Sequence, residues 1–134
     1  MALQALQKVA NAPRLIEAER IGPFTPRTAD VGVVLDLMIH DIDIILDLVD
    51  SPIDKVDAIG MSLLSPFEDV ASARIQFKNR CVANMTVSRV SRQKRRSMTV
   101  FQKDLYVVMD YMSQDITIYR KDISQGHTED PQSH

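Results

Sequence analysis

The chain has 134 residues, about the length of one domain, and 45% of them are hydrophobic, which is enough for a core. Its net charge of −2 argues against general affinity for nucleic acid, and no apolar run reaches the ~18 residues of a membrane span. The only cysteine, Cys81, excludes an internal disulfide and fits a reducing cytoplasm. The first residues lack the basic and apolar regions of a signal peptide, so a cytoplasmic location is expected.

The elements alternate little between helix and strand. The sequence predicts a helix-prone segment at 2–10, a strand at 14–21, a helix at 31–49, and strands at 56–64, 69–77, 81–90, 97–103, 105–112 and 115–120. The strands 69–77 and 81–90 are expected to form one antiparallel hairpin, and 97–103 and 105–112 a second. Thr28 or Asp30 can cap the helix. A strand and a helix followed by a run of strands predict an α+β fold, an antiparallel-rich mixed sheet with helices on one face. Residues 122–134 are poor in large apolar side chains and are predicted to be disordered.

The predicted helix at 31–49 is unusual in composition. At 100° per residue, one narrow stripe carries Asp36, His40, Asp43 and Asp47. The rest of its circumference is apolar except for Asp41, which is the reverse of an ordinary surface helix and predicts a mostly buried helix. Aspartate is a poor helix former, and carboxylates on one stripe repel each other. The stripe is therefore either an acidic solvent-facing surface or a functional site.

The segment Asp36-Leu-Met-Ile-His40, a D-x-x-x-H inside an apolar helix and continued as H-D-I-D, resembles the signature of the Gfo/Idh/MocA oxidoreductase family. In that family the signature lies in the C-terminal, substrate-binding domain. Residues Pro13 to Phe24 resemble the first strand of the same domain and the loop after it, and the resemblance extends to about Lys121. It implies a substrate-binding and oligomerisation domain at 1–121 and a tail at 122–134.

The resemblance also implies a reaction. Family members move a hydride from a hydroxyl-bearing carbon of a sugar, nucleotide sugar or cyclitol to NAD or NADP. Histidine suits the accompanying proton transfer because its unperturbed pKa is about 6.5. His40 is the match for the general acid/base, with Asp36 orienting its ring. Asp43 matches a position that binds substrate hydroxyls, and Arg20 and Arg27 flank the loop before the helix, within reach of a polar substrate.

A dinucleotide-binding fingerprint is missing from this chain. Its glycines, Gly22, Gly32, Gly60 and Gly126, do not cluster into the G-x-G-x-x-G turn that cradles a pyrophosphate. The chain therefore resembles the C-terminal domain without the family's N-terminal Rossmann domain, which binds NAD(P) and supplies a catalytic lysine. We expect no cofactor on this chain alone, and an N-terminal Rossmann domain as its partner. A fragment, a late start and a split gene all remain open.

Other functions compete with this interpretation. The basic run Arg89, Arg92, Lys94, Arg95 and Arg96 is either a solvated connection or a site for the phosphate of a nucleotide-linked substrate. Nucleic acid is disfavoured because no aromatic residues are interleaved to stack bases. Asp36, His40 and Asp43 have metal-ligand spacing, but no metal is expected because the other histidines lie in the tail. The remaining alternative is a non-catalytic dimerisation or ligand-binding module, and a homodimer through the sheet is expected in either case.

Overall fold

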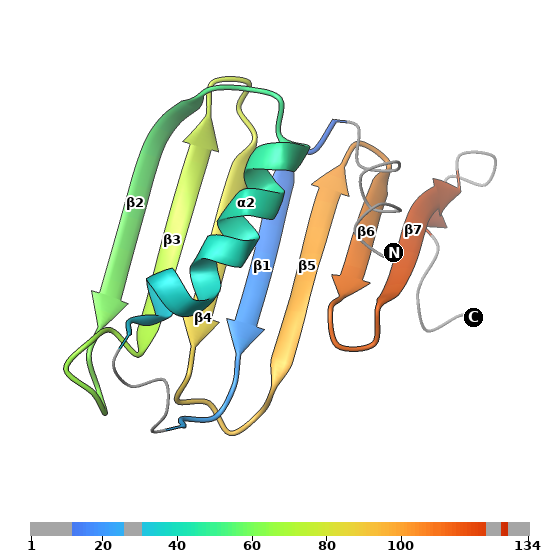
Figure 1. The fold of residues 1–134 in the computed structure, drawn as a ribbon. Coiled ribbons are helices and arrows are strands. Elements are labelled where there is room, and N and C mark those ends of the chain that lie inside the picture. The colour runs from blue at the N-terminus through green and yellow to red at the C-terminus, as the bar shows by residue number, and fades with distance from the viewer. Residues whose placement is uncertain (1–11, 26–30, 123–126, 129–134) are drawn as a thin grey trace.

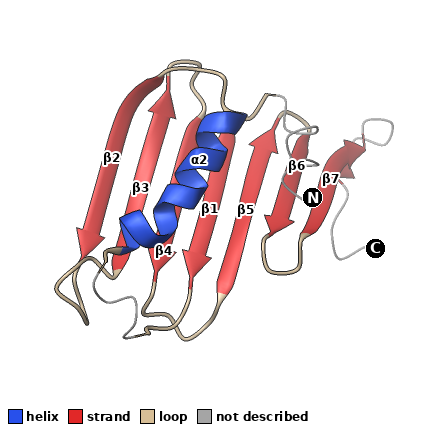
Figure 2. Cartoon of the chain, viewed as in Figure 1, coloured by secondary structure: helices blue, strands red, loops and turns tan. Residues whose placement is uncertain are grey.

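The computed structural model describes residues 12–25, 31–122 and 127–128, which form one sheet crossed on one face by a helix (Figure 1). The strands are β1 (Leu15–Ile21), β2 (Ile53–Met61), β3 (Val70–Phe77), β4 (Val82–Ser88), β5 (Arg95–Gln102), β6 (Leu105–Asp110), β7 (Asp115–Asp122) and β8 (His127–Thr128). A π-helical turn, η2 (Val34–Met38), leads directly into α2 (Ile39–Leu48). Figure 2 shows this helical segment against the strands. The predicted α+β class is confirmed, and the helix expected at 2–10 lies outside the described residues.

The sheet is mixed, as predicted, because the first strand lies in its middle. Its order is β2-β3-β4-β1-β5-β6-β7-β8. β1 runs parallel to β4 and antiparallel to β5, with Ala18 opposite both Met85 and Met98. The predicted hairpins β3–β4 and β5–β6 are confirmed, as is a last strand after them. This arrangement places the end of β1 beside the β4–β5 connection, where the basic run lies.

Three hairpin turns are built without glycine. Arg80, Asp104 and Gln114, which lie in the β3–β4, β5–β6 and β6–β7 turns, have φ values of 75°, 63° and 64°. A left-handed conformation matches the twist of the flanking strands and is uncommon for residues other than glycine. In the first of these turns the backbone N–H of Cys81 donates to Asn79 Oδ1 at 3.0 Å, so a side chain supports the turn.

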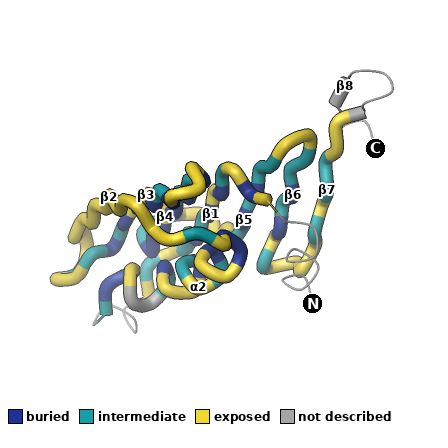
Figure 3. Tube along the Cα trace, turned by 90° about the horizontal axis from the view of Figure 1, so that it is seen from above, coloured by how far each residue is buried: buried dark blue, intermediate teal, exposed yellow. Residues whose placement is uncertain are grey.

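The hydrophobic core lies between α2 and one face of the sheet. Alternation along the strands places Ala18, Ile75, Met85 and Val100 on this face, all buried. Ile45 of α2 is also fully buried. Figure 3, viewed from above, shows the helix on one side of the sheet and the edge strand β2 exposed along its length. Cys81 is buried as well, at 2% exposure.

The opposite face of the sheet is polar over β3, β4 and β1. Ser72, Arg74 and Thr86 lie there, and Arg74 Nε donates to Asn84 Oδ1 at 2.9 Å. Further along this face, Phe101, Tyr106 and Tyr119 lie opposite one another on β5, β6 and β7. The ring centroids of Phe101 and Tyr106 are 5.5 Å apart, and those of Tyr106 and Tyr119 are 4.6 Å apart. The three rings therefore form an aromatic ladder. The face is therefore mixed: polar over most of β3, β4 and β1, aromatic along the ladder, and apolar at the edge, where Ile59 of β2 lies opposite Ser72 and is 63% exposed.

Candidate functional site

The outer face of α2 carries part of the acidic stripe. His40, Asp43 and Asp47 are exposed, as predicted for a stripe on one side. The expectation of a mostly buried helix was wrong for this face, because Ile39 and Leu46 are also exposed, at 42% and 44%. Among the described residues α2 has only the sheet to pack on, so its far side faces solvent. The candidate acid/base residue is thus displayed on an open surface that carries apolar side chains beside it.

Two of the predicted site residues, Asp36 and Arg27, have side chains outside the described part of the chain. The backbone of Asp36 forms part of η2. Arg27 lies outside the described residues altogether, as do the predicted caps Thr28 and Asp30. Glu68 serves the helix start instead, because its Oε2 accepts from the backbone N–H of Val34 at 3.1 Å. The pairing of Asp36 with His40 therefore stays a prediction.

Arg20 is fixed by a buried ion pair. Its Nη2 lies 3.1 Å from Asp41 Oδ1, and its Nε donates to Asp41 Oδ2 at 3.4 Å. Arg20 is 8% exposed and Asp41 is fully buried. The guanidinium also lies over the ring of Tyr111, with its carbon 4.9 Å from the ring centroid. Burial raises the pKa of the Tyr111 hydroxyl far above its usual range, and the nearby Asp41 carboxylate raises it further.

Asp41 was the one residue that departed from the apolar arc of the predicted helix. Sequence reasoning treated it as an exception and gave it no role, whereas the structure makes it the carboxylate that joins α2 to β1. A lone charged residue on an otherwise buried arc is itself a signal, because a buried charge requires a partner. The partner could not be named from the sequence, since Arg20 lies on a different element.

A second buried ion pair joins the β2–β3 loop to the end of β4. Arg89 Nε donates to Asp69 Oδ1 at 2.8 Å, and both residues are buried. The backbone N–H groups of Leu63, Leu64 and Ser65 donate to Asp69 Oδ2 at 2.7–3.0 Å. Burial by itself would raise the pKa of Asp69, but these hydrogen bonds and Arg89 hold that pKa well below its usual range.

These contacts correct two sequence expectations. The strand predicted to continue to residue 64 ends at Met61, because the next N–H groups turn toward the Asp69 carboxylate. Arg89 is not part of a solvated basic run, because it is 4% exposed and its Nη1 also donates to the backbone carbonyl of Val31. The Arg89 side chain therefore joins the segment before the helix to the β2–β3 loop.

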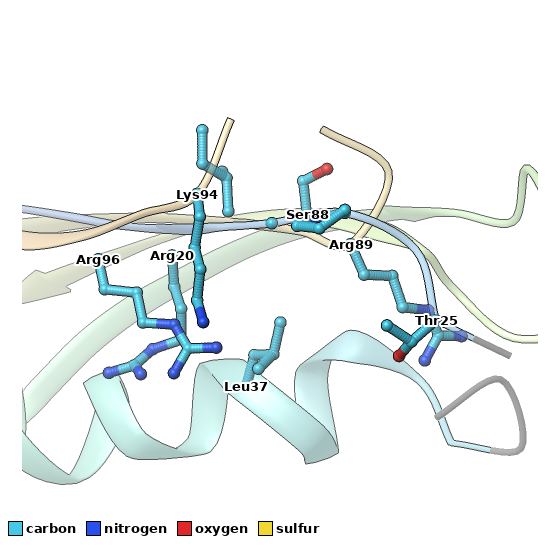
Figure 4. A pocket seen from close by; sticks show the side chains of 10 residues that line it. Arg20, Thr25, Leu37, Ser88, Arg89, Lys94 and Arg96 are labelled. Atoms are coloured by element: carbon cyan, nitrogen blue, oxygen red, sulfur yellow. The ribbon is translucent and has the colours of Figure 1, made fainter. Parts of the chain in front are cut away.

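A pocket of about 210 Å³ opens between the helical segment and the ends of the strands, near both ion pairs (Figure 4). Its lining residues are Arg20, Ile21, Gly22, Pro23, Thr25, Leu37, Ser88, Arg89, Lys94 and Arg96. They come from the end of β1 and the residues after it, from η2, from the end of β4, from the segment that joins β4 to β5, and from the start of β5. The pocket is strongly cationic, because its charged lining consists of three arginines and a lysine.

Neither a metal site nor a reactive thiol is evident in the described part of the chain. No three histidine, cysteine, aspartate or glutamate side chains lie close enough there to hold a metal ion. Burial raises the pKa of the Cys81 thiol, which disfavours the nucleophilic thiolate. None of the described helices is long and apolar enough to cross a membrane. The chemistry of the described residues is therefore concentrated on α2 and in the cationic pocket.

Comparisons with known proteins identify relatives of this arrangement. UDP-N-acetylglucosamine 3-dehydrogenase of Acidithiobacillus ferrooxidans is 40% identical over 121 residues, which are 90% of this chain and 39% of that protein. The solved structure of that dehydrogenase superposes with a TM-score of 0.85 at 37% identity, covering 96% of this chain and 42% of the other. Levoglucosan dehydrogenase in complex with NADH shares the fold, with a TM-score of 0.76 at 15% identity and the same 96% coverage of this chain, against 41% of its own.

The chain thus spans about two fifths of the length of these dehydrogenases. The family profile described as the GFO/IDH/MocA C-terminal domain matches residues 10–107, which include β1, the helical segment and the strands through β5. The resemblance inferred from Asp36, His40 and the strand before them is confirmed. This chain belongs to the GFO/IDH/MocA family and carries its C-terminal domain.

Proposed function

We propose that this chain is the substrate-binding and acid/base part of an NAD(P)-dependent oxidoreductase that acts on a hydroxyl of a sugar, nucleotide sugar or cyclitol. The observation that carries the proposal is His40, exposed on the outer face of α2 in a domain of this family. The named relatives are dehydrogenases, and one of them is solved with NADH. Residues 1–121 would form the working domain, in the cytoplasm, with an N-terminal dinucleotide-binding domain as the partner.

The proposed chemistry follows from the position of His40. A nicotinamide cofactor bound by the partner domain would supply the acceptor for the hydride that leaves the C–H bond of the carbinol. The hydroxyl on the same carbon would lose its proton to the imidazole of His40 as its O–H bond breaks and the C=O bond forms. Asp36, one helical turn earlier, would orient the ring, and Asp43 would bind a neighbouring hydroxyl. The exposed apolar residues Ile39 and Leu46 support the view that another domain covers this face.

Arg20 was expected to contact the substrate, but its guanidinium is already paired with Asp41. Because Asp41 holds the guanidinium, we propose that Arg20 chiefly fixes α2 over β1 and contributes positive potential to the pocket, rather than binding substrate hydroxyls directly. Arg27, which precedes the helix in the sequence and lies outside the described residues, stays a proposed substrate contact. The domain by itself is expected to be inactive, since the hydride acceptor is bound elsewhere.

The test uses the complete enzyme, or this chain combined with a complementing dinucleotide-binding domain. His40→Ala should lower turnover by about 10²–10⁴ with the protein still folded. Asp36→Asn should also slow the reaction by mispositioning the ring, and Asp47→Asn, further along the helix, should have little effect. Unchanged turnover in His40→Ala would remove the proposed proton-transfer role.

The alternative is a non-catalytic dimerisation or ligand-binding module. The observation that favours it is the aromatic ladder of Phe101, Tyr106 and Tyr119 on the open face, which is suited to pairing two copies. Pairing through this face is also proposed for the enzyme, so dimerisation does not distinguish the enzyme from the module. The genomic sequence upstream of Met1 distinguishes them. A glycine-rich fingerprint in frame or in an adjacent gene supports the enzyme, and its absence supports the module.

A further inference from the structure

We propose that the cationic pocket binds the diphosphate of a nucleoside diphosphate sugar, with Lys94 and Arg96 as its direct ligands. This inference rests on the proposed function and narrows its substrate class. The four cationic side chains of the pocket divide into two kinds. Arg20 and Arg89 are paired with the buried carboxylates of Asp41 and Asp69. Among the described residues, no carboxylate lies within ion-pair distance of Lys94 or Arg96, so within this part of the chain their positive charge has no buried counterpart.

Arg96 supplies the second observation. Its Nε is buried, and no hydrogen-bond acceptor in the described part of the chain reaches it. A buried donor without a partner is costly and uncommon in folded proteins. An anionic oxygen in the pocket would satisfy it, and a guanidinium matches phosphate geometry better than an ammonium does. Figure 4 shows the side chains of Lys94 and Arg96 extending from β5 and its preceding segment toward the helix, near Arg20.

The size of the pocket limits what it can hold. Its volume of about 210 Å³ is below the range of roughly 300–1,000 Å³ that encloses a complete drug-sized ligand. A phosphate or diphosphate fits such a space, whereas a whole nucleotide sugar does not. The remainder of the substrate would extend out of the pocket. Thr25 and Ser88 add polar groups to the lining that suit phosphate oxygens.

The position of Leu37 connects the pocket to the proposed reaction centre. Leu37 lines the pocket, and His40 follows three residues later on the same helical segment. The wall of the pocket and His40 are therefore carried by neighbouring turns of one helical segment. A diphosphate held by Lys94 and Arg96 would therefore leave the attached sugar free to extend along the helix toward His40. Anchoring a remote charged group in this way positions a substrate for reaction.

The chain provides a matched control for the two ligands. Arg95 lies between them in sequence but points to the other face of β5, where its Nη1 lies 2.9 Å from Glu19 Oε1. Arg95→Gln removes the same charge from the same strand without touching the pocket. Lys94 is exposed and Arg96 is partly exposed, so neither replacement removes a core side chain.

The experiment is a calorimetric titration of this chain with uridine diphosphate, inorganic pyrophosphate and uridine. We expect both anions to bind and uridine not to bind detectably. Lys94→Gln and Arg96→Gln should each weaken binding by about tenfold or more, as expected for a charged hydrogen bond. Arg95→Gln should change it by less than about twofold, and added salt should weaken it. Equal losses in all three variants, or uridine binding as tightly as its diphosphate, would overturn the proposal, and circular dichroism checks that the variants are folded.

The failure of this inference and that of the proposed function can be told apart. His40→Ala should leave the affinity for uridine diphosphate unchanged, because His40 is not a ligand of the anion. If anion binding depends on Lys94 and Arg96 while His40→Ala retains full turnover in the complete enzyme, the diphosphate site is supported and the proton-transfer role of His40 is wrong. If turnover on an uncharged sugar depends on His40 and no anion binds the wild-type chain, the diphosphate site is wrong and the proposed function is supported.

Discussion

Arg20 Nη2 lies 3.1 Å from Asp41 Oδ1, which joins the central strand of the sheet to the helix that carries His40. The two residues are separated by 21 positions in the sequence and are both buried. A buried ion pair orients the groups it joins, because each charge loses water and requires the other. This contact therefore sets where the stripe of α2 lies relative to the pocket at the end of β1.

Asp41→Ala should destabilise the fold strongly. Removing one member of a buried ion pair leaves the other charge uncompensated, which costs about 3–5 kcal/mol. Urea denaturation followed by circular dichroism measures the change, with Asp54→Ala as the control, since Asp54 pairs with Lys78 at an exposed site. The double variant Arg20→Met/Asp41→Leu should be more stable than Asp41→Ala. If the double variant is the least stable, the pair supplies net stabilisation beyond compensation of charge.

Stability in acid should depend on Asp69. Its pKa is lower in the folded chain than the value of about 3.9 in the unfolded chain, so the unfolded state binds more protons as the pH falls. The contribution of Asp69 is therefore complete above about pH 5 and is lost as the pH drops toward the folded-state pKa. Urea midpoints measured from neutral pH to about pH 2.5 should fall less steeply in Asp69→Asn, which also starts from a lower stability. Parallel curves for the two proteins would contradict the assignment.

His40→Leu should leave the stability of this chain almost unchanged. His40 is exposed on α2, and no hydrogen bond or ion pair joins it to another described residue. Exposed substitutions away from special features usually fall within about 0.5 kcal/mol. Chemical denaturation at pH 8 gives the comparison. A loss of several kcal/mol would show a structural histidine and would remove the physical argument that the residue is kept for catalysis.

The chain alone should not bind NADH measurably. None of its glycines forms the phosphate-cradling turn between a strand and a helix that dinucleotides require. The cationic pocket is too small for a whole dinucleotide, although it could weakly attract a phosphate. Calorimetric titration with NADH at physiological salt should give no dissociation constant tighter than about 100 μM. A tighter value that survives Arg96→Gln would reveal a cofactor site in this chain.

Tyr106→Glu should reduce self-association. Tyr106 is the central ring of the aromatic ladder, and a charge there would be buried if two copies pair through this face. Light scattering over a range of concentrations should show a dimer for the wild-type chain and a shift toward monomer for the variant. Lys78→Glu, at an exposed turn, serves as the control. A wild-type chain that stays monomeric at high concentration would exclude the proposed pairing.

The sequence by itself determined the elements and the family. Alternation predicted the β3–β4 and β5–β6 hairpins because side chains point to opposite faces of a strand and local turn residues connect neighbours. The helix, its stripe of His40 and Asp43, and the motif that carries the family resemblance could all be found because they depend on residues close together in sequence. These features are local, and local spacing fixes them.

The tertiary structure decided which charges are buried and which meet. The pairs Arg20–Asp41 and Arg89–Asp69 join residues 21 and 20 positions apart, and the register of β1 between β4 and β5 brings Arg20 and Arg96 to one pocket. No local pattern encodes that register, because the order of strands depends on how the whole sheet buries its apolar face. In the sequence Asp41 is only an exception to the apolar arc, and Arg89 is one member of a basic run. In the fold both are buried. A buried charge requires a partner of opposite charge, and each of the two has one.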